Sequence, residues 1–196
     1  MSRSALLGAL VALPLLAYAQ SPVRHVRGTV TSLAGNTLNV RETDGTSIPV
    51  TLTPGWAVAG VKPITLAAIK PGSYIGAAAT GPGDHPTAIE VLVFPEALRG
   101  AGEGQYGWDL PQTTMTNGTV SAEVASSSGR VLTVNAKGKT VQMTVPENVP
   151  VVTFEPGTPA LVTPGAHVFL AVMPGPNGTV TTSRVAVGVN GTVPPM

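Results

Sequence analysis

The stretch Gly28-Thr-Val-Thr-Ser32 decides the fold, because it recurs 90 residues later as Gly118-Thr-Val-Ser-Ala122. A second match follows in the same order, since Pro71-Gly72 recurs as Pro164-Gly165 at an offset of 93 residues. The longer offset indicates a short insertion in the second copy, most simply at residues 125–129. Two copies of one unit are typical of a repeated architecture.

Each copy consists of short apolar segments separated by Gly and Pro turns. In residues 26–31, Val and Gly alternate with Arg and Thr, which is the period of a strand. Asp44-Gly45 is a hairpin signal. The one helix-like stretch of the first copy, residues 66–69, is stopped by Pro71-Gly72. The predicted strands are residues 26–31, 37–41, 47–52, 56–61, 73–79 and 88–94, then 117–123, 130–135, 139–145, 149–154, 166–172 and 179–187.

Three strands, a helical turn and two further strands is the order of a small barrel of the OB type, with a two-sheet sandwich as the alternative. We therefore predict an all-β protein of two tandem OB-like β-barrel repeats, residues 24–94 and 113–189. Residues 95–112 form a linker rich in Gly and aromatic residues, which we expect to be ordered, and residues 190–196 form a tail.

The first 19 residues have the pattern of a secretory signal peptide. Arg3 is followed by an apolar run over residues 5–16 and by Ala17-Tyr-Ala19, with small residues where a signal peptidase cuts. The run is too short to span a bilayer, which needs about 20 residues. We expect a periplasmic or secreted protein with no transmembrane anchor after signal removal.

The net charge and the absence of cysteine limit the classes of function and the means of stabilisation open to this chain. The formal net charge of the whole chain is +1, and it falls to 0 when Arg3 leaves with the signal. A neutral surface argues against binding of nucleic acid, which requires a basic stripe. Cysteine is absent, so an exported form depends on its core and not on disulfides.

Catalytic patterns are weak in this chain. The imidazole bases available are His25, His85 and His167, and none stands beside a recognisable nucleophile motif. Residues 102–107 match G-x-G-x-x-G formally, but no helix start follows, as a dinucleotide site requires. We predict that the protein is not an enzyme and holds no cofactor.

The linker carries the densest group of polar and aromatic residues, and it has two interpretations. Glu103, Tyr106, Trp108 and Asp109 could form a loop that contacts a partner, because Trp and Tyr are frequent anchors of interfaces. The same residues could instead clamp the two barrels at a fixed angle.

A divalent metal site is an alternative. Asp84, His85 and Glu90 lie within one predicted hairpin, and carboxylate with imidazole suits a borderline divalent ion. No close-spaced His pair supports these three residues.

Four stretches carry a resemblance to known sequences: Phe94-Pro-Glu-Ala-Leu-Arg-Gly-Ala-Gly-Glu-Gly104, Trp108-Asp-Leu110, Thr114-Met-Thr-Asn-Gly-Thr-Val120 and Gly191-Thr-Val-Pro-Pro-Met196. They resemble a family of small exported alphaproteobacterial proteins, and each half is similar to the DUF5666-type β domain. Members often carry the label of a metal ABC transporter permease, which a chain with one removable apolar segment does not fit. The family linker often has His and Arg where this chain has Gln105 and Tyr106.

These observations predict an exported, non-catalytic binding or scaffolding module of the bacterial cell envelope. Its partner would be an envelope protein or a small ligand. The alternative is a periplasmic accessory protein for a divalent metal or small ligand, associated with a transporter.

Overall fold

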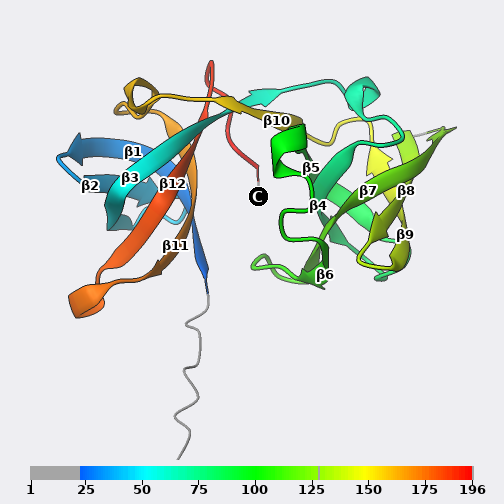
Figure 1. Cartoon of the computed structure of the whole chain (residues 1–196), viewed down its shortest axis with the longest axis horizontal. Coiled ribbons are helices and arrows are strands. Elements are labelled where there is room, and N and C mark those ends of the chain that lie inside the picture. Colours follow the sequence, from blue (N-terminus) through cyan, green and yellow to red (C-terminus); the bar gives the residue numbers. More distant parts are fainter. Residues whose placement is uncertain (1–22, 128, 196) are drawn as a thin grey trace, which may run out of the picture.

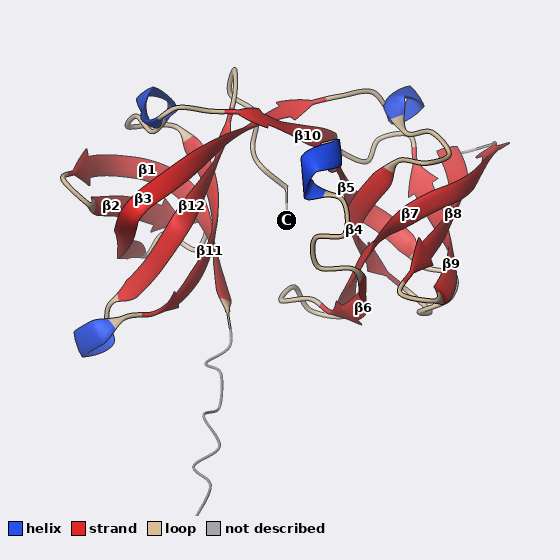
Figure 2. Cartoon of the chain, viewed as in Figure 1, coloured by secondary structure: helices blue, strands red, loops and turns tan. Residues whose placement is uncertain are grey.

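A computed structural model describes residues 23–127 and 129–195, and the predicted signal peptide lies outside them (Figure 1). The described part is all-β, as predicted, with short 3-10 turns as its only helices (Figure 2). None of its helices is long and apolar enough to cross a membrane. The strands are β1 (Arg24–Ala34), β2 (Thr37–Glu42), β3 (Ser47–Pro63), β4 (Tyr74–Thr80), β5 (Thr87–Val93), β6 (Gly104–Gly107), β7 (Thr113–Ser126), β8 (Gly129–Ala136), β9 (Lys139–Pro146), β10 (Val151–Pro156), β11 (His167–Pro174) and β12 (Val180–Gly188). The 3-10 turns are η1 (Leu66–Ala68), η2 (Glu96–Leu98), η3 (Pro159–Leu161) and η4 (Pro176–Gly178).

Five strands close into a first barrel in the order β12-β11-β1-β2-β3. The ring is completed by parallel pairing of β12 with β3, from Val180–Val50 to Gly188–Val61. Alternate residues of each strand point inward, as strand geometry requires. They form one core whose fully buried members include Val26, Leu38, Leu52, Leu170 and Val185.

A second ring runs β5-β4-β7-β8-β9, and we call it the second barrel. Its closing pair is parallel and short, Thr87 with Thr144. Two backbone hydrogen bonds support the seam, from Gln142 N to the Asp84 carbonyl and from Thr144 N to the Pro86 carbonyl. Its separate core includes Ile75, Leu132, Val134, Val141 and Met143.

The barrels do not follow the two sequence copies. Residues 24–94 supply β1, β2 and β3 to the first barrel but β4 and β5 to the second. Residues 113–189 likewise supply β7, β8 and β9 to the second barrel and β11 and β12 to the first. The predicted ranges therefore delimit the two sequence copies. They do not delimit the barrels, because each barrel pairs strands from both copies and neither copy closes on itself.

The length of β3 explains this exchange. We expected two strands, residues 47–52 and 56–61, but β3 is continuous over 17 residues. At about 3.3 Å per residue such a strand spans roughly 55 Å. It pairs with β2 at one end and with β10 at the other. The chain thus leaves the first barrel before β4 begins, and η1 is the one element between β3 and β4.

The crossing of β3 and β10 joins the two barrels and relates them by approximate symmetry (Figure 1). Val61 pairs with Phe154, which is also 93 residues further along the chain. A residue paired with its own repeat equivalent marks a two-fold relation at that point. A third apolar cluster, which includes Val61, Leu92 and Phe169, fills the junction.

The repeated glycines have a structural reason. A Cβ on Gly28 would overlap the carbonyl of Arg41, and a Cβ on Gly118 would overlap that of Asn135. Each glycine precedes a bulge, between Val30 and Ser32 in one copy and at the equivalent place of β7 in the other. Bulges increase strand bending, which closing a narrow barrel needs.

Both the linker and the tail pack against the barrels. Residues 95–112 contain η2 and β6, and β6 pairs with β7. The tail turns at Asn190, which has a φ of 53°. Pro194 is then buried.

Candidate binding cleft

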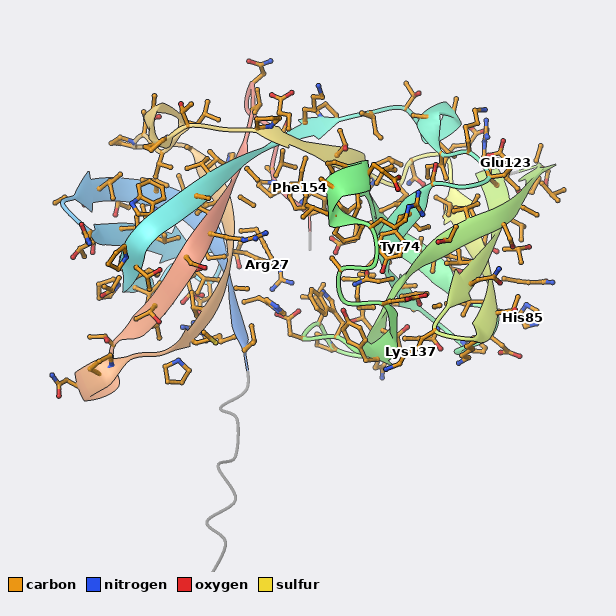
Figure 3. The ribbon with its side chains drawn as sticks, in the orientation of Figure 1. Arg27, Tyr74, His85, Glu123, Lys137 and Phe154 are labelled. Atoms are coloured by element: carbon orange, nitrogen blue, oxygen red, sulfur yellow. The ribbon has the colours of Figure 1, made fainter. Side chains whose placement is uncertain are left out.

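The outer face of the first barrel that looks toward the second barrel carries the candidate site. On β1, Val26 points into the core, so His25 and Arg27 point outward. Pairing of β1 with β11 places Arg27 beside Phe169. Figure 3 labels Arg27 on the inner side of the first barrel and Tyr74 on the facing side of the second.

An apolar cavity of about 420 Å³ lies on this face. Its floor comes from β3, β11 and β12 of the first barrel, with Phe154 of β10 on one side. Leu98 of the linker lines the side of the cavity that faces the second barrel. Its lining is Ala57, Val58, Ala59, Leu98, Phe154, Phe169, Ala171, Arg184, Val185 and Ala186.

Asp109 ties the linker to the first barrel. Its carboxylate accepts hydrogen bonds from Arg27 Nη1 at 2.8 Å and Nη2 at 2.9 Å. His25 Nδ1 lies 2.9 Å from the same carboxylate. Partial burial acts to raise the pKa of Asp109, but the hydrogen bonds from Arg27 and His25 outweigh it and hold the pKa below its usual value. Asp109 is therefore ionised in this arrangement at neutral pH.

Four aromatic rings continue from the linker into the cleft. The Trp108 ring lies between His25, at a centroid distance of 4.4 Å, and Tyr106, at 6.4 Å. His25 stacks in turn on Phe169 at 5.2 Å. The guanidinium of Arg27 lies over Phe169, 5.1 Å from the ring centroid. The Phe169 ring of the cavity wall is thus held in place by the linker contacts.

Asn117 fixes the other side of the linker on the second barrel. It stands 90 residues after Arg27, at the equivalent position of the second copy. Its side chain is 6% exposed, and Nδ2 donates to the carbonyls of Ala101 and Gly102 and to Tyr106 Oη. The linker therefore covers this face of the second barrel, whereas the corresponding face of the first barrel holds the open cavity.

The four predicted linker residues are not all in one place. Trp108 and Asp109 contact the first barrel, as the clamp interpretation requires. Tyr106 is 42% exposed beside them. Glu103 faces the turn between β8 and β9, where it accepts a hydrogen bond from Lys137 N at 3.2 Å.

The sequence did not predict that one face would hold His25, Arg27, Phe169 and Arg184. The available signal was strand alternation, which places His25 and Arg27 on the side opposite Val26. Nothing in the alternation showed that β11 and β12, about 140 residues away, would lie beside β1 and β3.

Of the three predicted metal ligands, two lie on an exposed turn and one lies on a strand. His85 Nε2 lies 3.7 Å from Asp84 Oδ2 on an exposed turn. His85 is on the side of the second barrel away from the cleft (Figure 3). Glu90 is 8% exposed on β5. Over residues 23–127 and 129–195, no three His, Cys, Asp or Glu side chains group in a way that could hold a metal ion.

The cleft also contains a His–Asp pair, the orienting half of a nucleophilic triad. His25 Nδ1 is hydrogen-bonded to the Asp109 carboxylate. In the part of the chain that the structure describes, Asp109 is the one hydrogen-bonding partner of the His25 ring, and no Ser or Thr hydroxyl is hydrogen-bonded to that ring as a nucleophile would be. The contact between His25 and Asp109 links β1 of the first barrel to the linker.

No family model, curated protein or solved structure matches this chain.

Proposed function

We propose that this protein is an exported, non-catalytic binding module of the bacterial cell envelope that takes a small apolar ligand into the cleft between its two barrels. The observation that carries the proposal is the 420 Å³ cavity, in which nine of the ten lining residues are apolar. Ligand pockets of proteins are mostly apolar concavities of about 300–1,000 Å³ with a few polar groups.

The cavity wall is held by fixed contacts on both sides. Phe169 is stacked on His25, and His25 and Arg27 are held by Asp109. Phe154 packs against Phe94 with ring centroids 6.3 Å apart. A preformed wall lowers the entropy cost of binding, which favours capture of a small molecule.

An OB-like identity of each barrel belongs to the same proposal. Its support is the ring order β1-β2-β3-β12-β11 with a parallel β3–β12 seam, and the corresponding order β7-β8-β9-β5-β4 with a parallel β5–β9 seam. A five-stranded Greek-key barrel has this arrangement. Export is supported by the signal-like residues 1–19.

The test is a cavity-filling substitution in the full chain. Ala171→Trp places a large ring in the cavity, while Ala125→Trp adds the same ring at an exposed position of β7 as a matched control. Binding is followed with 8-anilinonaphthalene sulfonate, whose fluorescence rises on apolar surfaces. We expect Ala171→Trp to lose the signal and Ala125→Trp to retain it. Equal binding by both variants would place the dye elsewhere and refute the proposal.

A further inference from the structure

Arg184 is the one charged residue that lines the cavity. Within residues 23–127 and 129–195 its side chain has no hydrogen bond, ion pair or ring contact, and only its backbone is bonded. A guanidinium prefers a carboxylate or phosphate partner and can bind one through two parallel hydrogen bonds. An unpaired cation at the edge of an apolar cavity is therefore a site for an anionic group.

The position of Arg184 on the outer face depends on a local irregularity. The pairing of β12 with β3 shifts register between Thr182 and Arg184. Thr182 is 5% exposed, and without the shift Arg184 would point to the same side as Thr182. The Thr182 hydroxyl donates to the Arg184 carbonyl at 3.0 Å and lies 3.2 Å from its amide nitrogen. The strand is thus bent so that Arg184 faces the cavity.

The charges around the cavity are favourable for an anion. Arg27 lies over the lining residue Phe169, and Asp109 balances it. Two further carboxylates near this junction are already paired, Glu155 with Lys62 at 2.7 Å and Glu96 with Arg99 at 2.6 Å. Arg184 is left as the cation that an entering anion can neutralise.

The remaining walls fit an apolar body. Four alanines, Ala57, Ala59, Ala171 and Ala186, leave the space open, and Leu98, Phe154 and Phe169 supply broad apolar surfaces around it. Burial of alkyl or aromatic surface there removes apolar area from water, which favours binding.

We infer that the ligand is a small apolar monocarboxylate, whose body fills the cavity and whose carboxylate pairs with Arg184. This inference rests on the proposed function, because it names the ligand class of the same cleft. A single unpaired guanidinium matches one carboxylate in charge and in its two-oxygen geometry.

The experiment measures binding of sodium decanoate and of 1-decanol, which differ in the charged group, by displacement of the uncharged apolar dye N-phenyl-1-naphthylamine from the full chain. Variant Arg184→Gln removes the charge at the cavity. Variant Arg41→Gln makes the same change on β2, at an exposed arginine that does not line the cavity. Both retain a polar side chain at an exposed position, so folding is preserved and is checked by the unfolding transition.

We expect decanoate to bind the native protein more tightly than decanol. Arg184→Gln is expected to weaken decanoate binding by roughly three- to tenfold, because an exposed charge-assisted pair is lost, and to leave decanol unchanged. Arg41→Gln is expected to leave both unchanged.

Two results would overturn the inference, and they are distinguishable. If decanol binds as tightly as decanoate and Arg184→Gln has no effect, the cleft still binds apolar ligands but does not select an anion. If neither molecule displaces the dye, the proposed function fails together with the ligand class.

Discussion

At the scale of single residues, Asp109 has the clearest role. One carboxylate receives two hydrogen bonds from Arg27 and faces His25, and this joins the linker to the first barrel. Asn117 makes the corresponding attachment to the second barrel through an amide. The two equivalent positions of the repeat, 27 and 117, thus hold opposite ends of the same linker.

Substitution Asp109→Asn is predicted to lower the free energy of unfolding by about 1 kcal/mol, a value reduced for partial exposure of the pair. Partial burial acts to raise the pKa of Asp109, but hydrogen bonds from Arg27 and His25 hold the folded-state pKa below its usual value. Its contribution is therefore fully present above the unfolded pKa and disappears as the pH falls through the lower folded pKa. Urea unfolding at pH 7 and at stepwise lower pH measures the difference between native and variant.

Asp84→Asn, on an exposed turn, is the control for this measurement. A difference between native protein and Asp109→Asn that stays constant down to acid pH would show that the ion pair contributes nothing.

At the scale of elements, the bulges of β1 and β7 determine how the barrels close. Each follows a glycine whose missing Cβ permits a neighbouring strand to approach. The glycines were visible in the sequence as part of the repeat, but their purpose was not. It depends on the carbonyls of Arg41 and Asn135, which belong to the partner strands.

Gly28→Ala and Gly118→Ala are each predicted to destabilise the protein by about 2 kcal/mol, because a methyl group would overlap backbone that cannot move aside. Gly107→Ala is the matched control, since a Cβ there meets no atom within 4 Å. The measurement is the midpoint and slope of urea unfolding. Equal, small losses at all three positions would contradict the close approach.

At the scale of the whole molecule, the exchange of strands makes the two copies one folding unit. Each barrel is built from strands of both copies. The approximate two-fold relation at Val61 and Phe154 keeps the two barrels alike, and it leaves one linker for two equivalent faces. Because the single linker covers this face of the second barrel and only borders the equivalent face of the first, the cavity on the first barrel stays open.

Cutting the linker is predicted to leave the two fragments associated. A specific protease site inserted between Leu110 and Pro111 would separate β1–β6 from β7–β12. Because each barrel needs strands from both fragments, we expect them to elute together on gel filtration and to separate only in denaturant. Two separately folded halves after cleavage would contradict the strand exchange.

Alternation along strands is a local property, so the sequence by itself determined much of this protein. It determined the all-β class and the positions of most strands to within a few residues, although β3 was predicted as two strands and β6 was not predicted. It also marked the linker as the segment with exceptional side chains.

The tertiary structure alone decided which copy completes each barrel and what the linker contacts. Two similar copies present nearly the same strand edges, so local sequence does not distinguish pairing within a copy from pairing between copies. The continuity of β3 across Pro54-Gly55 made that choice, and it brought Phe169 and Arg184 to the face of Arg27. The cavity exists because those residues converge from distant parts of the chain.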